Sequence, residues 1–416
     1  MTARPAAAER VIELDIHGIA AGGDGVGRSE GMVVFVPRTA PGDRARVRIV
    51  ASLRFARGTL LDVVRPAPDR AEPPCPHYSI DRCGGCQLQH LRYEAQLAAK
   101  AAIVRDALRR IGKRDVELPA VRPSGSQWRY RTKLTLAMRR GRDGWTMGLH
   151  PYDDPVGVFQ LDDCPITDER VLITWREIAA AAAYLPPADG LRGAVRLVRG
   201  GATIVIEGGT SWPKHDAFLD SIPSAVALWW KPEEGARRLI GERAHAPAGA
   251  SFTQVNAAVA DDLRVHTLAR VRAHRPSTVV DAYAGIGDTA APLAESGIRV
   301  VAIELDREAA ARCAARLSAG SRAVAGKVED VLPRVLPADV VLLNPPRTGV
   351  DERVTSALAR QAPPPRAIVY VSCDPATLAR DVARLPRFRV ASLVAFDMFP
   401  QTAHVETVCE LVPEAA

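Results

Sequence analysis

The sequence predicts a protein of three parts: a small all-β barrel or sandwich, a mostly β central region with a cysteine-rich loop, and a C-terminal α/β domain with a doubly wound sheet. At 416 residues the chain is too long for one ordinary core, since a domain usually holds about 100 to 200 residues. Short alternating apolar runs fill its first part, and strand patterns alternate with helix patterns in its last third.

The first part covers residues 9–66. Its apolar residues alternate with polar ones in short runs that Gly and Pro interrupt: VIELDIHGIA, MVVFVPRTAPG, RARVRIV and GTLLDVVRPAP. This period of two, broken by frequent turn residues, is typical of a small barrel. Prolines at positions 66, 68, 73 and 74 then predict a linker into the cysteine loop.

The central region, 67–250, starts with that loop and continues with a helix expected over 92–112, which could pack on the C-terminal domain. Beyond it the segments KLTLAM, VRLVRG, ATIVIEG and AVALWW indicate strands, and an alanine-rich stretch predicts a helix near 174–184. From residue 251 onward the texture is that of alternating strands and helices, so we expect the third domain at 251–416.

The N-terminal segment MTARPAAAERVIELDIHG has an acidic residue where a secretory signal needs an unbroken apolar core, and no later run approaches the ~20 apolar residues of a membrane span. We therefore expect a cytoplasmic protein without a membrane partner. The net charge of +7 permits an anionic partner. Eight arginines lie in 38–70, and the segment QWRYRTK at 127–133 mixes cations with aromatics. Both patterns suit phosphate contacts and base stacking, although a solvated basic face explains either alone.

Seven cysteines in such a chain indicate metal binding or catalysis rather than disulfides. Cys75, Cys83 and Cys86 have the spacing C-x7-C-x2-C, and Cys164 adds a second Cys-Pro step. One short loop with two more distant thiols favours a [4Fe–4S] cluster, structural zinc is the main alternative, and a chance surface grouping is a weaker one. The patterns around the cysteines at 313 and 409 predict buried core residues.

A nucleotide-type site is predicted at 277–294, STVVDAYAGIGDTAAPLA, where a strand, a turn with Gly285 and Gly287, and a helix follow one another. Glu304 ends the next strand, where a carboxylate binds ribose hydroxyls. The turn alone fits a dinucleotide or S-adenosylmethionine. Asp281 at the end of the first strand and two downstream loops favour the methyl donor.

The first downstream loop is VVLLNPPRTG, 340–349, which holds Asn344 at a strand's carboxyl end. A polar residue followed by two prolines is typical of methyltransferases that act on flat heterocycles. The second is VYVSCDPATLARD, 369–381, in which Cys373 lies at the tip of the next strand. Ligands bind beyond the carboxyl ends of such strands, so we expect its thiol to face the donor pocket, with the helix starting at Pro375 favouring the thiolate.

These motifs together resemble the RNA 5-methyluridine methyltransferases, most closely the 23S ribosomal uracil-5 branch, which has an N-terminal TRAM domain and an iron–sulfur cluster. The resemblance runs along nearly the whole chain, through SFTQVN at 251–256, the donor loop, NPPR, SCDPATLARD and FDMFPQTAHVETV at 396–408. It implies a TRAM/OB-like barrel, a class I methyltransferase domain, and S-adenosylmethionine-dependent methylation of uridine carbon 5 in RNA. RNA is the partner it implies, and no obligate protein partner is inferred.

The resemblance also implies roles for individual residues. Cys373 would be the nucleophile that adds to uracil carbon 6, and Glu406 the general base that removes the carbon 5 proton. The donor-binding positions are Gln254, Asp281, Tyr283, Gly285, Gly287, Asp288, Glu304 and Asn344, and the cluster ligands are Cys75, Cys83, Cys86 and Cys164.

The chain departs from many relatives at Asp374 and Asp288, where they have Asn, and at Asn344, where they have Asp. Transfer RNA is an alternative substrate. An RNA cytosine-5 methyltransferase, a dinucleotide-dependent oxidoreductase and a non-catalytic RNA-binding scaffold are alternative functions.

Overall fold

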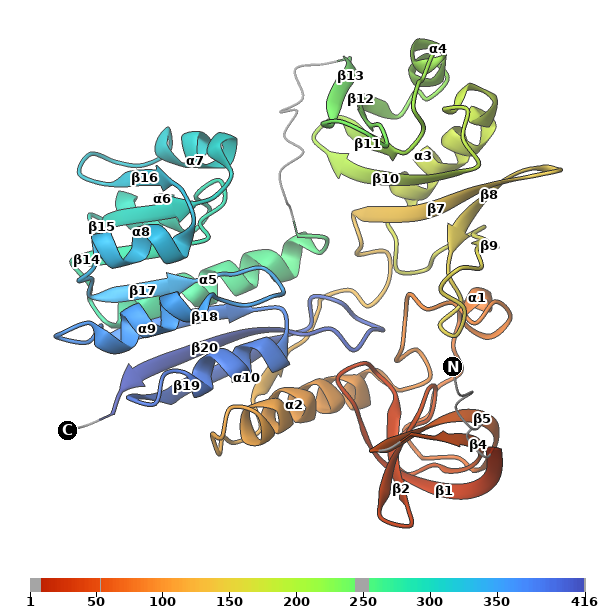
Figure 1. Ribbon diagram of the computed structural model, residues 1–416, viewed down its shortest axis with the longest axis horizontal. Coiled ribbons are helices and arrows are strands. Elements are labelled where there is room, and N and C mark those ends of the chain that lie inside the picture. The colour runs from red at the N-terminus through yellow and green to blue at the C-terminus, as the bar shows by residue number, and fades with distance from the viewer. Residues whose placement is uncertain (1–8, 53, 244–253, 415–416) are drawn as a thin grey trace, which may run out of the picture.

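The computed structural model describes residues 9–52, 54–243 and 254–414, which form three bodies (Figure 1). The first is a closed five-stranded barrel in the order β1-β2-β3-β5-β4. Its strands are β1 (Glu9–Ile19), β2 (Gly25–Ser29), β3 (Met32–Val36), β4 (Arg44–Ala51) and β5 (Phe55–Arg65).

Alternation along β4 explains both the barrel core and its basic outside. Ala45, Val47 and Ile49 are buried, whereas Arg44 and the other arginines between them are exposed. Several arginines of the barrel have acidic neighbours. Arg44 of β4 lies 2.8 Å from Glu13, Arg46 of β4 lies 3.6 Å from a second carboxylate, and Arg65 of β5 lies 3.9 Å from a third. Much of the basic cluster at 38–70 is thus paired with carboxylates of the barrel and its linker.

The second body is a seven-stranded sheet in the order β13-β12-β11-β10-β7-β8-β9. Its strands are β7 (Lys133–Gly141), β8 (Gly144–Leu149), β9 (Phe159–Gln160), β10 (Gly190–Val198), β11 (Gly201–Glu207), β12 (Ala225–Lys231) and β13 (Arg238–Glu242). Helices α3 (Glu169–Ala180) and α4 (His215–Asp220) contribute buried side chains to its core. The expected helix near 174–184 begins earlier, because Asp168 caps it by accepting from the Arg170 amide at 2.9 Å.

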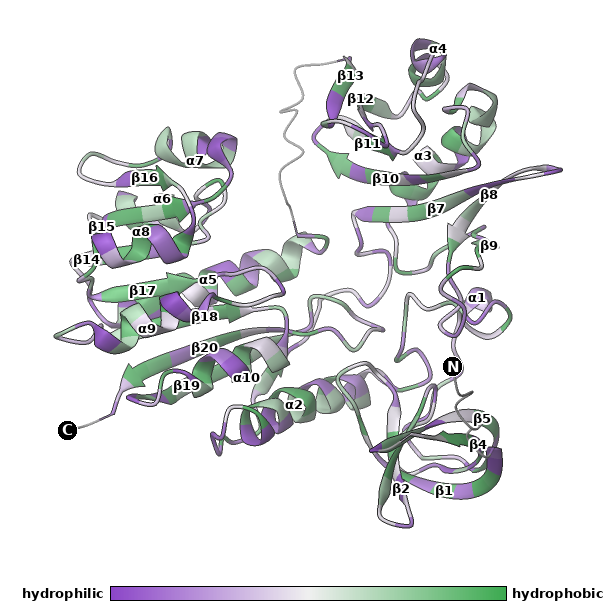
Figure 2. Cartoon of the chain, in the orientation of Figure 1, coloured by the Kyte–Doolittle hydropathy of each residue, from purple (hydrophilic) through white to green (hydrophobic). Residues whose placement is uncertain are grey.

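The third body is an eight-stranded sheet in the order β16-β15-β14-β17-β18-β20-β19-β6, and Figure 2 shows how apolar its strands are. The strands are β6 (Ala120–Arg122), β14 (Thr278–Ala282), β15 (Arg299–Glu304), β16 (Arg322–Ala325), β17 (Val340–Leu343), β18 (Ala367–Ser372), β19 (Phe388–Phe396) and β20 (Glu406–Pro413). The helices are α5 (Ala257–Ala273), α6 (Ala290–Glu295), α7 (Arg307–Ala314), α8 (Val328–Val335), α9 (Glu352–Arg360) and α10 (Pro375–Ala383). The predicted fold class is confirmed.

Two earlier segments pack on this third body. Helix α2 (Tyr93–Arg110) buries Val104 and Leu108 in the same core as Leu378 and Val382 of α10. Strand β6 pairs with β19 at the sheet edge, with Val121 opposite Ala395. The short helix α1 (Pro76–Ser79) lies in the cysteine loop instead. Among the helices of the described residues, none combines the length and apolar character needed to cross a bilayer.

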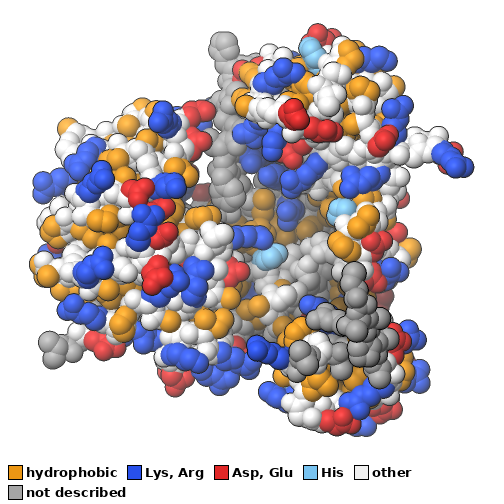
Figure 3. Space-filling view, viewed as in Figure 1, with side chains coloured by type: hydrophobic (Ala, Val, Ile, Leu, Met, Phe, Trp, Pro, Cys, Tyr) orange, Lys and Arg blue, Asp and Glu red, His pale blue; other side chains and the backbone are white. Residues whose placement is uncertain are grey.

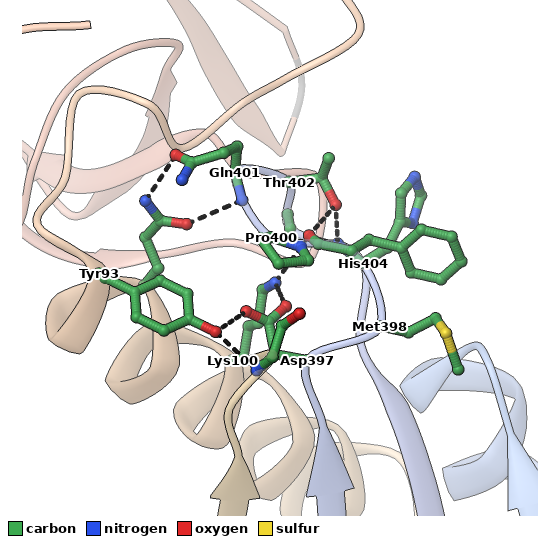
Figure 4. A network of polar contacts seen from close by, with 12 residues as sticks. Tyr93, Lys100, Asp397, Met398, Pro400, Gln401, Thr402 and His404 are labelled. Atoms are coloured by element: carbon green, nitrogen blue, oxygen red, sulfur yellow. Dashed lines mark hydrogen bonds and ion pairs between the residues drawn. The ribbon is translucent and has the colours of Figure 1, made fainter. Parts of the chain in front are cut away.

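The bodies meet at residues 397–405, which we call the junction loop (Figure 4). Lys100 of α2 is fully buried and forms an ion pair with Asp397, which also accepts from the Tyr93 hydroxyl at 2.8 Å. Gln96 accepts from the Gln401 amide at 2.9 Å. The Gln401 carbonyl in turn accepts from the amides of residues 87 and 88 in the cysteine loop, at 3.1 and 2.9 Å. One loop therefore ties α2 and the cysteine loop to the third body.

Removing one partner of this ion pair should destabilise the protein strongly. Burial lowers the pKa of Lys100 while Asp397 opposes the shift, and a buried charge left without its partner typically costs about 3 to 5 kcal/mol. We expect Lys100→Met to lower the urea midpoint of the far-UV circular dichroism transition clearly. Arg82→Met, which breaks an exposed pair with Asp153, should leave that midpoint unchanged; equal midpoints for the two variants would contradict this account.

Candidate active site

Cys373 and Glu406 lie opposite each other at the carboxyl end of β18. The antiparallel register of β18 and β20 pairs Ser372 with Thr407, whose hydroxyl donates to the Ser372 carbonyl at 3.1 Å. The next residues along this register are Cys373, directly after β18, and Glu406, the first residue of β20. Cys373 is half-buried and Glu406 is buried. The sheet thus brings together two residues that lie 33 positions apart in the sequence.

Burial and a shared cation set the charges of this pair. Burial raises the pKa of Glu406 to about 7, and the guanidinium of Arg347 opposes that rise. The pKa of the Cys373 thiol is also raised, first by burial and then by the Glu406 charge, with Arg347 again opposing. The start of α10, which we expected to favour the thiolate, does not bring the pKa of Cys373 below its ordinary value. Asp374 caps α10 by accepting from the Thr377 amide at 2.8 Å, which places a carboxylate beside the thiol.

Sequence reasoning missed the role of Arg347. This exposed side chain follows the two prolines of the loop after β17. Its charge opposes the rise in the pKa values of Cys373 and Glu406 and contributes to the lowered pKa of His404. His404 is on the junction loop, where its ring lies edge-on to Phe399 at 5.9 Å (Figure 4). The signal for Arg347 was its place directly after Asn-Pro-Pro, since a cation there reaches the same strand ends.

Asp381, buried in α10, holds the loop that carries Arg347. Its carboxylate accepts from the Val350 amide at 2.9 Å, from the Tyr370 hydroxyl at 2.8 Å and from Arg380 at 2.9 Å. Arg380 also donates to the Thr348 carbonyl at 2.8 Å. The loop after β17 is thereby fastened to the helix that follows Cys373, so that both strand ends keep a fixed spacing.

The glycine turn after β14 leaves room above the sheet. Gly285 has a φ of +56°, and a Cβ there would meet nothing within 4 Å. Gly287, at φ +87°, is required for packing, because a Cβ would lie 2.7 Å from the sulfur of Cys313. Tyr283 has a φ of +65°, a conformation that a bulky residue adopts only when its surroundings enforce it. Such backbone is common where a ligand approaches the main chain.

The acidic residues of this turn fit the polar groups of a methyl donor. Asp281 is fully buried, accepts from the Thr289 hydroxyl at 2.5 Å, and has a second oxygen without a hydrogen-bond partner among the described residues. Burial raises its pKa to about 7. Glu304 accepts from the amides of Gly285 and Asp306, both at 2.8 Å. An unpaired buried oxygen calls for a donor group, which an ammonium or hydroxyl of the ligand supplies.

The other predicted donor residues are placed as follows. Asn344 is exposed. Its backbone N–H donates to the Ala282 carbonyl at 3.2 Å, so β14 and β17 end side by side. Asp288 is exposed and forms an ion pair with Arg316 at 2.8 Å. Gln254 is half-buried just before α5. Residues 251–253 of the SFTQVN motif lie outside the described residues.

The four cysteines of the predicted cluster line one cavity of about 130 Å³. All four are buried, and the Gly85 amide lies 3.4 Å from the sulfur of Cys83. Burial raises the pKa of Cys83 to about 11, and the charges of Cys164 and Cys75 raise it further. In the part of the chain that the structure describes, no three His, Cys, Asp or Glu side chains are already arranged to hold a metal ion.

A doubly wound sheet, an open glycine turn flanked by carboxylates, and a thiol facing a buried carboxylate define the class of a methyltransferase that uses S-adenosylmethionine. The family description tRNA (uracil-5-)-methyltransferase matches residues 242–412, and TRAM domain matches 9–61. RNA methyltransferases of Thermosynechococcus vestitus and Halalkalibacterium halodurans are 32% and 31% identical to the chain; the first match covers 96% of the chain and 97% of the relative, the second 96% of each.

A crystal structure of the Pyrococcus abyssi tRNA (uracil-54, C5)-methyltransferase with S-adenosyl-L-homocysteine has the same fold. The TM-score is 0.71 at 23% identity, over 96% of this chain and 99% of that one. The chain belongs to the RNA (uracil-5-)-methyltransferase family with an N-terminal TRAM domain, and it is an RNA methyltransferase.

Replacing Glu406 by Gln should stabilise the protein at alkaline pH. A carboxyl whose folded pKa lies near 7 stabilises the fold below its unfolded pKa of about 4.3, and that contribution is lost as the pH rises through 7. Chemical denaturation should therefore show Glu406→Gln and the native chain to be nearly equal at pH 4.5. At pH 8.5 the variant should be more stable, by on the order of 3 kcal/mol. The same difference at both pH values would refute the buried carboxyl.

Proposed function

We propose that this enzyme methylates carbon 5 of a uridine in ribosomal RNA through covalent addition of Cys373, with Glu406 as the base. The observation that carries the proposal is the pairing of Cys373 with Glu406 across β18 and β20, beside the cation of Arg347. A thiol and a carboxyl near the carboxyl end of β18, in the same domain as an open glycine turn, supply the two protein groups that the reaction needs.

The chemistry follows from the weak nucleophilicity of uracil carbon 5. The thiolate of Cys373 adds to carbon 6, forming a sulfur–carbon bond and an enolate whose carbon 5 is electron-rich. The bound donor supplies an electrophilic methyl group on a sulfonium. Glu406 then removes the hydrogen left on carbon 5, and the electron pair of that bond expels the Cys373 thiolate. With a pKa of about 7, Glu406 is matched to this proton transfer near neutral pH.

Arg347 has two tasks in this scheme. Its charge opposes the rise in the pKa of Cys373, and so favours the thiolate over the thiol. The same cation would also stabilise the negative charge that develops on the enolate oxygen. The Asp381 contacts that hold the loop keep this cation in place.

We propose that the barrel at 9–66 and the central region at 67–250 hold RNA, while 251–416 performs the methyl transfer. The ribosomal substrate is supported by the cysteine loop, which the 23S branch of the family carries. Transfer RNA is the second candidate, because the family description and the Pyrococcus abyssi structure both name it. The target base must leave its stack in either case, since sulfur and methyl approach opposite ring faces.

Tritium release should test the reaction directly. We expect the native chain to release tritium from RNA labelled at uridine carbon 5 when S-adenosylmethionine is present, and Cys373→Ala to release none above background, because carbon 5 is not activated without addition at carbon 6. Ribosomal and transfer RNA from a strain lacking the modification should be assayed separately. Release from transfer RNA alone would overturn the ribosomal proposal.

Glu406→Gln provides the matched variant in the same assay. Addition and methyl transfer need no base, so this variant should trap RNA on Cys373 as a complex that survives denaturing electrophoresis. Absence of such a complex, with release retained, would assign the base to another residue.

We further propose that Cys75, Cys83, Cys86 and Cys164 bind a [4Fe–4S] cluster, with structural zinc as the alternative. Four buried thiols around one cavity raise one another's pKa values, and a cationic centre removes that repulsion. Cys373 is not among the residues that line the cavity, which supports a structural role.

Metal analysis should distinguish the two centres. After anaerobic purification we expect about four iron and four sulfide per chain and visible absorption. Cys83→Ser should lose most of both, whereas Cys409→Ala, at a buried cysteine within β20, should keep them. One zinc and no sulfide in the native chain would refute the cluster.

A further inference from the structure

One face of the central sheet is basic, and among the described residues α3 and α4 pack on the opposite face. Along β7, β10 and β11, the buried side chains Leu134, Val195 and Ile204 belong to the core shared with α3. Strand alternation sends the intervening residues to the other face. Figure 3 shows Lys and Arg side chains gathered in the hollow between the central body and the third body.

The strand register arranges this face in three neighbouring rows. In the first row Lys133 lies opposite Arg196. In the middle row Thr135, Ala194 and Val205 lie side by side. In the third row Arg192 lies opposite Glu207. Small side chains in the middle row leave a hollow of about 100 Å³ with cations on both sides, and Arg237 also lines it.

Like charges crowd around this hollow. Its lining contains four cations, Lys133, Arg192, Arg196 and Arg237, but one carboxylate, Glu207, which lies 3.5 Å from Arg192. The pKa of Lys133 is lowered first by burial and then by Arg196, Arg192 and Arg131. Such an excess of cations over a shallow floor is suited to an anion.

An aromatic residue lies next to the hollow in the strand register. Trp229 of β12 lies beside Val205 in the middle row, and the guanidinium of Arg237 lies 5.5 Å from its ring centroid. The indole N–H of Trp229 has no hydrogen-bond partner among the residues that the structure describes. A tryptophan next to cations offers a surface for a nucleobase as well as for phosphate.

We propose that this hollow binds the phosphodiester backbone of a single-stranded RNA segment next to the target uridine. The proposal rests on the function proposed above and adds a specific contact surface to it. Arg192 and Arg196 are four residues apart on one strand, about 13 Å, so the face spans more than one phosphate. Bound phosphates relieve the repulsion among the cations and thereby lower the free energy of the complex.

The test is the salt dependence of RNA affinity in a double variant, Lys133→Gln with Arg192→Gln. Fluorescence anisotropy with a labelled oligouridylate should show a dissociation constant at least ~10-fold higher at low salt, and a log–log salt slope smaller by about 1.4, or about 0.7 for each lost phosphate contact. The melting temperature should be unchanged or higher, because removing crowded cations relieves repulsion. A lower melting temperature with an unchanged slope would overturn the proposal.

Matched variants make the result specific. Arg170→Gln with Arg176→Gln removes two exposed charges from α3, on the opposite side of the sheet, and should leave affinity and slope unchanged. Lys133→Arg with Arg192→Lys keeps the charges and should keep both. If inorganic phosphate binding is lost but RNA affinity is not, the hollow is a small-anion site and the proposal fails. If the native chain methylates RNA and the double variant binds RNA normally, this inference falls while the function stands.

Discussion

The buried ion pair between Lys100 and Asp397 is the contact on which the arrangement of the molecule depends. Two charges removed from water are tolerated only where each has its partner and further hydrogen bonds, and here Tyr93 and the Phe399 carbonyl provide them. Because Asp397 directly follows β19 and the junction loop leads to Glu406, the pair that joins α2 to the third body also holds the loop that positions the Glu406 carboxyl. The same contacts therefore hold α2 against the third body and position the loop before Glu406.

The same loop connects the cysteine region to the site. The amides of residues 87 and 88 donate to the Gln401 carbonyl, and Tyr130 donates to the Pro400 carbonyl at 3.0 Å. The segments that contain residues 87, 88 and Tyr130 are thus attached at the loop that precedes Glu406, while Asp381 holds the loop after β17. The candidate site thus lies between two segments that hydrogen bonds hold in place, the junction loop and the loop after β17.

The local residue pattern predicted the elements whose conformation depends mainly on their own residues. The barrel could be recognised because alternation in β4 is strict, and Cys373 because it lies between the end of an apolar strand and the start of a helix. Asp374 accepts from the Thr377 amide, a task that Asn performs equally well, which explains why either residue suits this position. Strand β6 could not be predicted, since three residues gain their strand geometry from β19 alone. Arg347 and Asp381 were missed because their contacts come from distant segments.

The position of β20 also determines the order in which the site can form. This strand follows β18 and β19 in the chain but lies between them in the sheet. Until β20 enters, the edges of β18 and β19 that face each other are unpaired, and Glu406 is not yet brought to the thiol of Cys373. Entry of β20 therefore completes the sheet and brings these two groups together in one event, so a chain whose third sheet is incomplete has the thiol without the neighbouring carboxyl.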